Sequence, residues 1–332
     1  IKIHALIELA DDFKIFTNDY QNAVKALSCF SLLNEHEVFV FTDKPTSLEV
    51  QIQRLYDMDA IVLIRERTPI TDALLAQLPN LKLISQTGKV SQHIDVLACH
   101  KHGVTITEGV GSAIAPAELC WALVLAASRH LVPYAQNLKS GLWQNAGSLG
   151  LGRTLEGLTF GIWGYGRIGQ RIARYANAFG MHILVWGSET SRQQAIHDGF
   201  TAANSKSEFF SQAEVVSLHL RLNDATRECV RFNDLQLMKP DALLVNISRA
   251  ELIEKSALLR SLQTGKPGFA TLDVFEAEPI DAETEPLLTM PNVLCSPHLG
   301  YVEKNSYELY FKNAFENVVN FFNGNPQHVI RS

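Results

Sequence analysis

The chain has 332 residues, of which 46% are hydrophobic and 19% are charged, and its formal net charge at pH 7 is −6. These proportions exclude a mainly disordered chain, and the length suggests about two domains. The acidic balance argues against a nucleic-acid-binding surface and against attachment to anionic lipid. The longest apolar run, between Glu118 and Arg129, is about half of the ~20 residues that cross a bilayer, and the first residues lack the apolar region of a signal peptide. We therefore expect neither a nucleic acid nor a membrane as a partner.

The five cysteines indicate a reducing compartment. They are odd in number, widely scattered, and form no C-x-x-C motif. Such a pattern is typical of reduced thiols in the cytoplasm, and it predicts neither a disulfide framework nor a metal site. The five are Cys29, Cys99, Cys120, Cys229 and Cys295.

Strand-like and helix-like segments alternate in the first third of the chain. Such alternation is typical of a parallel sheet covered by helices, so we predict an α/β fold. The expected strands span residues 1–8, 37–41, 60–64 and 81–85, with a helix at 71–77.

The middle of the chain contains a long helix and then a loose region. Pro116 and Glu118 fit the start of a helix that we predict over residues 115–129. Residues 140–152 contain four glycines, and we interpret them as a loop between subdomains or an arm that reaches a partner. The alternation of strands and helices resumes near residue 158, and a last amphipathic helix is predicted at 307–322.

A glycine motif follows the apolar strand predicted at residues 158–163. The motif is Gly164-x-Gly166-x-x-Gly169, with a helix after it and a second strand at 181–186. Gly164 permits a tight turn, Gly166 lets backbone N–H groups approach a pyrophosphate, and Gly169 lets helix and strand pack closely. In this context the motif predicts dinucleotide binding rather than a tight turn alone.

The end of the second strand bears on the choice between NAD and NADP. An Asp or Glu there would read the adenosine ribose, but this chain has Gly187, and its first acid is Glu189. Ser188 and Arg192 could instead receive a 2′-phosphate, which favours NADP. The alternative is an ordinary polar turn with Glu189 in solvent, so the choice stays open.

Three later strand-like runs are each followed by a residue suited to catalysis, namely Arg249, Glu278 and His298. Because parallel strands end at one edge of a sheet, these side chains are expected to converge. Arginine offers a forked double donor to a carboxylate, histidine can give a proton to a carbonyl oxygen, and a carboxylate favours the protonated imidazole. Taken singly, the three fit a surface ion pair, a solvated loop acid and a capping residue. The runs span residues 242–248, 268–275 and 292–296.

These motifs, in this order, resemble the D-isomer-specific 2-hydroxyacid dehydrogenase family over nearly the whole chain. The matching segments are 115–118, 164–169, 216–220, 245–249, 273–279 and 296–300. The resemblance implies an α/β fold with two Rossmann-like domains that contain parallel sheets. A flavodoxin-like substrate domain would comprise residues 1–105 and 296–332, and the dinucleotide-binding domain would comprise residues 106–295.

The resemblance also implies roles for individual residues. Arg249, Glu278 and His298 would be the catalytic trio, and Asp273 would lie near the nicotinamide amide. His219 would line the cofactor together with the glycine motif, which includes Arg167 and Ile168. A homodimer is implied as well, with the arm at residues 140–152 in its contacts.

The chain departs from the family pattern where the substrate is expected to bind. The substrate loop is Thr87, Gly88, Lys89 and Val90, in which Val90 replaces a second glycine. Lys89 could bind an anionic group of the substrate, or it could face solvent. Ala250 and Arg221 also differ from the usual residues, and together these departures leave the substrate open.

We therefore expect an NAD- or NADP-dependent oxidoreductase that interconverts small 2-oxo acids and D-2-hydroxy acids. Glyoxylate, hydroxypyruvate, pyruvate and larger acids all fit. Formate oxidation is disfavoured, because a glutamine usually takes the role of Glu278 in relatives that catalyse it. The alternative is a non-catalytic nicotinamide-binding sensor or transcriptional corepressor on the same fold, and the intact trio argues against it.

Overall fold

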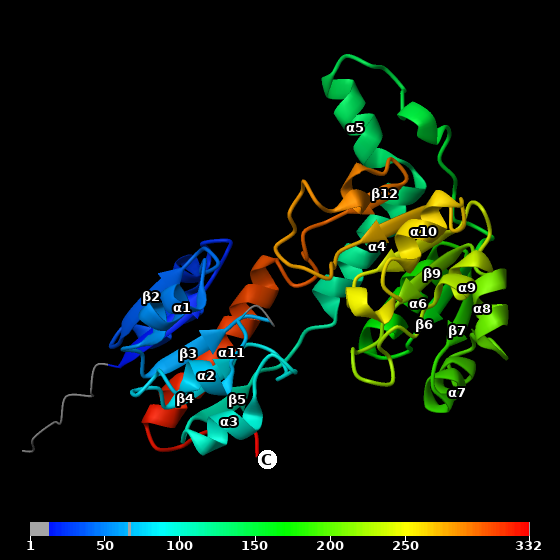
Figure 1. The fold of residues 1–332 in the computed structure, drawn as a ribbon. Coiled ribbons are helices and arrows are strands. Elements are labelled where there is room, and N and C mark those ends of the chain that lie inside the picture. Colours follow the sequence, from blue (N-terminus) through cyan, green and yellow to red (C-terminus); the bar gives the residue numbers. More distant parts are fainter. Residues whose placement is uncertain (1–12, 66–67, 332) are drawn as a thin grey trace, which may run out of the picture. The chain divides into compact units, whose positions relative to one another are not determined.

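A computed structural model describes residues 13–65 and 68–331 of the chain, which folds into two compact units. The first unit comprises Ile1–Gly111 and Glu303–Ser332, and the second comprises Ser112–Val302. In Figure 1 the first unit runs from blue to cyan and ends in red, and the second runs from green to orange. The strand predicted at residues 1–8 lies outside the described residues.

The division between the units falls later in the chain than the sequence suggested. The sequence placed the crossings after residues 105 and 295, whereas the contacts place them after Gly111 and Val302. Gly109 donates its N–H to Gly88, which ties this segment to the first unit, and Leu299 and Gly300 donate to Asp273 of the second unit. His298 therefore belongs to the second unit, and not to the substrate domain in which the expected boundary put it.

The first unit contains a parallel five-stranded sheet in the order β2-β1-β3-β4-β5. The strands are β1 (Lys14–Asn18), β2 (Glu37–Phe41), β3 (Ala60–Leu63), β4 (Leu83–Gln86) and β5 (Thr105–Glu108). The helices are α1 (Leu48–Leu55), α2 (Asp72–Leu75), α3 (Val96–Lys101) and α11 (Lys304–Phe322). This strand order is that of flavodoxin-like sheets, as predicted.

Helices cover both faces of this sheet because successive side chains point to opposite faces, and the central strand β3 is apolar and buried throughout. Ile61 and Leu63 of β3 join the buried cluster that contains residues of α1, α2 and α3. On the opposite face the hydroxyl of Ser85 donates to the carbonyl of Ala314 at 2.9 Å, which places α11 against β4.

The second unit contains a parallel seven-stranded sheet in the order β12-β11-β10-β9-β6-β7-β8. Counted from β6, the order begins as the dinucleotide-binding sheet does, with the order reversing between β6 and β9. The strands are β6 (Thr159–Trp163), β7 (His182–Trp186), β8 (Thr201–Ala202), β9 (Val215–Leu218), β10 (Leu243–Asn246), β11 (Phe269–Leu272) and β12 (Val293–Cys295).

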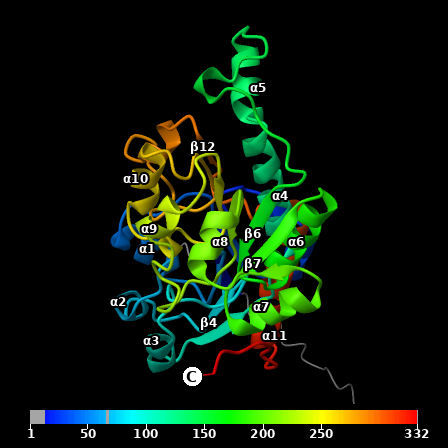
Figure 2. The same cartoon turned by 90° about the vertical axis from the view of Figure 1, so that its right-hand side faces the viewer.

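The second sheet is buried between two layers of helices. Phe160 and Ile162 of β6 face a cluster with α4 and α6, whereas Trp163 faces a cluster with α8, α9 and α10. Figure 2 shows these two layers on either side of the sheet. The helices are α4 (Ile114–Ser128), α5 (Leu131–Lys139), α6 (Arg167–Ala178), α7 (Glu189–His197), α8 (Lys206–Gln212), α9 (Phe232–Gln236) and α10 (Ala257–Gln263).

The sequence analysis did not place several elements, among them β1, β5, α1, α3 and α5. The chain turns sharply at His130, whose φ is 50°, and then forms α5 ahead of the loose region. Pro133 stands at the third position of α5, where its missing N–H removes no helical hydrogen bond. Within residues 140–152 the structure has one short turn, η3 (Gly147–Leu149). No helix within residues 13–65 and 68–331 is long and apolar enough to cross a membrane.

Candidate active site

Three neighbouring strands carry the residues that the sequence singled out for catalysis. Arg249 follows β10, Glu278 follows β11, and His298 follows β12. The three strands pair in parallel, so their carboxyl ends lie at one edge of the sheet. The second unit therefore brings the three residues to one edge.

His298 and Glu278 form a short polar pair. The Nδ1 atom of His298 lies 2.6 Å from Oε2 of Glu278, and the other carboxylate oxygen accepts the N–H of Phe275 at 3.0 Å. The two side chains are 14% and 31% exposed, so the pair is shielded but accessible. Because the bond engages Nδ1, the ring is oriented and Nε2 is the nitrogen available for proton transfer.

The charge state of Glu278 follows from its neighbours. Burial acts to raise the pKa of this carboxyl, but the hydrogen bond and charge of His298, the Phe275 N–H and the charge of Arg249 outweigh it. The net effect lowers the pKa of Glu278 below its usual value, so the side chain is a carboxylate at neutral pH. Arg249 thus acts electrostatically on the same pair, which joins the three residues in one cluster.

The side chains of Asn246, which is buried, and Ser248, which is half-buried, fix the backbone around Arg249. The Asn246 side chain donates to the carbonyl of Arg249 at 2.8 Å, and the Ser248 hydroxyl donates to the carbonyl of Leu218 at 2.7 Å. The guanidinium itself donates to the Ser248 carbonyl at 2.6 Å. The arginine is therefore held by β9 and β10 together.

Asp273 supports the loop that carries His298. Its buried carboxylate accepts hydrogen bonds from Ser296 Oγ at 2.6 Å, Leu299 N at 2.7 Å and Gly300 N at 2.9 Å. Burial raises its pKa, against the lowering effect of these donors and of the His298 charge. His298 has a φ of 53°, a conformation that non-glycine residues adopt only when the surroundings hold them there. The sequence analysis missed this supporting contact, although Asp273 and the Ser296 segment each end a neighbouring strand.

The glycine motif has the geometry of a phosphate-binding loop. A Cβ at Gly164 would lie 2.6 Å from the carbonyl oxygen of His219, and one at Gly169 would lie 2.2 Å from that of Gly164. At Gly166 a Cβ would meet nothing within 4 Å, so this glycine leaves open space in front of the loop. Gly166 is also the N-cap of α6 and gives it no side-chain cap, which leaves backbone donors for an anion. Arg167 is exposed on the first turn, and Ile168 packs against the core.

The residues after β7 form a small charged cluster. The hydroxyl of Ser188 accepts the N–H of Ser191 at 3.3 Å and caps α7. Arg192 pairs with Glu189 at 2.5 Å, and its guanidinium lies over the ring of Trp186, 5.2 Å from the centroid. The charge of Arg192 is therefore already balanced by an acid.

His219 lies at the point where the strand order reverses. It follows β9, and its backbone N–H donates to the Trp163 carbonyl at 2.8 Å, beside the phosphate loop. Its Nε2 lies 2.9 Å from Ser217 Oγ, and burial lowers the pKa of the ring to about 4. Its Nδ1 is buried without a hydrogen-bond partner. A glycine cradle, an uncapped helix end and an orphaned ring nitrogen together fit a bound dinucleotide.

The predicted substrate loop belongs to the first unit. Thr87 and Gly88 are buried at the end of β4, and Lys89 is exposed. The ammonium of Lys89 pairs with Glu108 of β5, which also accepts the N–H of Val90 at 3.4 Å. The sequence alternatives were a substrate contact and a side chain in solvent, and neither anticipated this partner.

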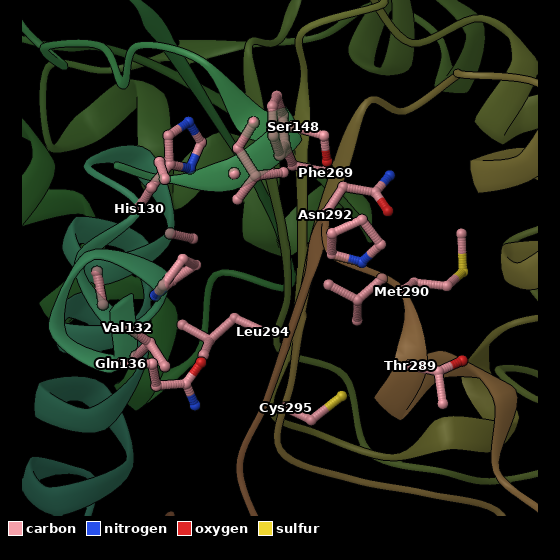
Figure 3. Close-up of a pocket in the computed structure, with 18 of the residues that line it drawn as sticks. His130, Val132, Gln136, Ser148, Phe269, Thr289, Met290, Asn292, Leu294 and Cys295 are labelled. Atoms are coloured by element: carbon pink, nitrogen blue, oxygen red, sulfur yellow. The ribbon is translucent and has the colours of Figure 1, made fainter. Parts of the chain in front are cut away.

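A separate cavity of about 470 Å³ lies in the second unit. Figure 3 shows His130, Val132 and Gln136 on one side of it and Met290, Asn292 and Leu294 on the other. It lies between α5 and β12, and the catalytic candidates do not line it. In the described part of the chain, no cluster of three or more His, Cys, Asp or Glu side chains could hold a metal ion.

Residues 121–300 match the family described as D-isomer specific 2-hydroxyacid dehydrogenase, NAD binding domain. The chain belongs to this family. It is therefore an oxidoreductase that acts on 2-hydroxy acids with a nicotinamide dinucleotide, and the predicted family, fold class and class of reaction are confirmed.

Individual relatives support the assignment. A crystal structure of phosphoglycerate oxidoreductase from Vibrio cholerae is 60% identical, with 95% of this chain and 100% of that chain covered and a TM-score of 0.92. The glyoxylate reductase of Aeropyrum pernix is 33% identical over 289 residues, which cover 85% of each protein. The D-3-phosphoglycerate dehydrogenase of Methanocaldococcus jannaschii is 34% identical over 86% of this chain, and this chain spans about half (53%) of its length.

Two glycine substitutions in the phosphate loop should affect different properties, one the stability of the fold and the other the affinity for the dinucleotide. Gly169→Ala would force a Cβ against the Gly164 carbonyl, so we expect a loss of roughly 1–3 kcal/mol in the free energy of unfolding. Gly166→Ala meets no protein atom, so stability should stay within about 0.5 kcal/mol of wild type, whereas dinucleotide affinity falls. Urea unfolding and cofactor titration measure the two effects. Unchanged cofactor affinity in Gly166→Ala would contradict the assignment of the loop.

Proposed function

We propose that the protein interconverts small 2-oxo acids and D-2-hydroxy acids with His298 as the general acid and base. Glu278 orients the imidazole, and Arg249 binds the substrate carboxylate. The observation that carries this proposal is the 2.6 Å contact between His298 and Glu278, in the electrostatic reach of Arg249. A sensor or corepressor on the same fold has no need of such a pair.

The proposed chemistry divides between cofactor and protein. When bound, the reduced nicotinamide supplies the hydride. His298, protonated and held through Nδ1, gives the proton on Nε2 to the carbonyl oxygen of the 2-oxo acid. In the reverse direction the neutral ring takes the proton from the hydroxyl group. The Glu278 carboxylate stabilises the imidazolium in both directions.

Arg249 suits the role of substrate anchor because a guanidinium presents two parallel donors to a carboxylate. The Asn246 and Ser248 side chains fix the backbone around it, so the fork can be positioned before substrate arrives. We further propose that Thr87, Gly88, Lys89 and Val90 of the first unit contribute the substrate loop. This unit, Ile1–Gly111 with Glu303–Ser332, is then the substrate domain.

The cofactor proposal rests on the second unit. Gly164, Gly166 and Gly169, with Arg167 and Ile168 on the first turn of α6, would hold the pyrophosphate. Asp273 and His219 would lie on the nicotinamide half. Ser188 and Arg192 would accept the 2′-phosphate of NADP, which requires that Arg192 be shared with or released from Glu189.

We also propose a homodimer in the cytoplasm. The arm formed by α5 and residues 140–152 exposes large apolar side chains, among them Trp143 at 77% and Leu151 at 92%. Such a surface favours burial against a second copy. All five cysteines are unpaired, which fits a reducing compartment.

The substrate anchor is tested by Arg249→Lys on a panel of 2-oxo acids. A point ammonium cannot reproduce the guanidinium fork, so kcat/KM should fall on the order of 10²-fold or more, roughly 3 kcal/mol of transition-state stabilisation. The panel contains glyoxylate, hydroxypyruvate, pyruvate and a phosphorylated 2-oxo acid, and loss of reduced-nicotinamide absorbance is followed. Arg174→Lys on the exposed side of α6 is the matched control. Near-normal kinetics for Arg249→Lys would remove Arg249 from its role, and an inert wild type would favour the sensor.

The proton donor is tested by the pH dependence of Glu278→Gln. The lowered pKa of Glu278 keeps it charged throughout the neutral range, where it stabilises the imidazolium. Without that charge the imidazolium loses the carboxylate that stabilises it. The falling limb of the reduction profile and the rising limb of the oxidation profile should therefore both move to lower pH. Profiles of kcat/KM in both directions measure the shift, and coincident limbs for the two proteins would show that Glu278 is not coupled to the proton.

Cofactor choice is tested at the pair formed by Arg192 and Glu189. If Arg192 receives the 2′-phosphate, Arg192→Ala should weaken NADPH binding about tenfold while changing NADH binding little. Glu189→Gln frees the same guanidinium and should act in the opposite direction. Titration of both reduced cofactors gives the two affinities. A wild-type preference for NADH of a hundredfold or more would contradict this assignment.

A further inference from the structure

A network of three polar side chains, those of Cys120, Ser217 and His219, connects α4 to the end of β9. The thiol of Cys120 lies 3.5 Å from Ser217 Oγ, and that oxygen lies 2.9 Å from His219 Nε2. Cys120 and Ser217 are both completely buried. Ser217 and His219 are two residues apart on an extended segment, which places their side chains on the same side of the sheet. The proposed catalytic trio is not part of this network.

The other ring nitrogen of His219, Nδ1, is the one polar atom of this network that lacks a hydrogen-bond partner. Its Nδ1 is buried and has no hydrogen-bond partner, whereas buried polar atoms in proteins are nearly always bonded. The residue lies beside Gly164, whose added Cβ would come within 2.6 Å of the His219 carbonyl. This is the reversal point of the strand order, where sheets of this kind bind their ligands. A partner for Nδ1 is therefore expected from the bound cofactor.

The hydrogen-bond donors and acceptors of this network decide which ring nitrogen of His219 carries the proton. Burial raises the pKa of the Cys120 thiol to about 12, so the thiol keeps its proton and can donate it to Ser217. The serine hydroxyl has a single proton, and an imidazole nitrogen is a much better acceptor for it than sulfur. The hydroxyl therefore donates to Nε2. A neutral ring that accepts at Nε2 carries its proton on Nδ1.

We propose that Ser217 and Cys120 hold His219 as the neutral tautomer protonated on Nδ1, and that this N–H donates to an oxygen of the dinucleotide. The inference deepens the proposed function and rests on the cofactor site described there. His219 is then a cofactor-binding residue, and Ser217 and Cys120 are positioning residues.

A neutral donor suits a cofactor that changes charge. The oxidised nicotinamide is a cation, and a protonated histidine beside the dinucleotide would disfavour it. Burial lowers the pKa of His219 to about 4, so the ring gains no charge in the neutral range. The fixed tautomer supplies one oriented donor to either redox form.

The tautomer can be measured in the protein without cofactor. Two-bond ¹⁵N–¹H correlation spectra distinguish protonated from unprotonated ring nitrogens, and the signal that disappears in His219→Asn assigns His219 among the 11 histidines. We expect protonated Nδ1 and unprotonated Nε2 in the wild type. In Ser217→Ala we expect the ring to lose this single state. A wild-type ring protonated on Nε2 would overturn the proposal.

Two isosteres test the donor itself. The amide nitrogen of an asparagine falls near the position of Nδ1, and that of a glutamine falls near Nε2. His219→Gln should therefore weaken binding of both NADH and NADPH roughly tenfold, whereas His219→Asn should weaken it several-fold less. Fluorescence titration gives the affinities, and thermal unfolding shows whether the two variants fold equally well.

The outcomes separate this inference from the proposed function. Equal losses in Asn and Gln variants of equal stability would overturn the donor role, even if the enzyme remains active. A wild type that binds neither dinucleotide would remove the cofactor site itself, whatever the tautomer. Where the variants differ in stability, the spectrum of the wild type decides.

Discussion

The edge of the second sheet that carries His298 depends on the buried carboxylate of Asp273. Three donors from the segment 296–300 converge on its two oxygens, and they hold His298 in a left-handed conformation. A buried carboxylate is expensive unless its lone pairs are satisfied, so the strand end and the loop stabilise one another. Because these hydrogen bonds fix the backbone of the 296–300 segment, the His298 ring is placed within reach of Glu278. The proposed catalytic pair and the local fold therefore depend on the same hydrogen bonds.

At the glycine motif the local backbone is again held in one conformation, but here by close packing rather than by hydrogen bonds to a carboxylate. Gly164 and Gly169 bring the loop against neighbouring carbonyl groups, and Gly166 alone leaves an opening. The two glycines that pack tightly set the position of the third. Because β6 and β9 meet here, the backbone of His219 lies beside that loop.

Local signals made much of this predictable from the sequence. The glycine spacing predicted the tight turn between β6 and α6, and the polar residues after β10, β11 and β12 indicated one edge of the sheet, because parallel strands share their direction. Contacts between distant elements gave no such signal. The pairing of Lys89 with Glu108 and the link from Cys120 to Ser217 depend on which strands and helices become neighbours. The helix α5 was missed because its start is a turn at His130 with no side-chain cap.

The order in which the chain is made has a consequence for the first unit. Its sheet is complete at β5, but one face is covered by α11, which comes from the far end of the chain. The whole of Ser112–Val302 is synthesised in between. During synthesis the nucleotide-binding half can therefore finish folding first, while the earlier sheet keeps an apolar face exposed. That interval is the period when the nascent chain most needs protection from aggregation.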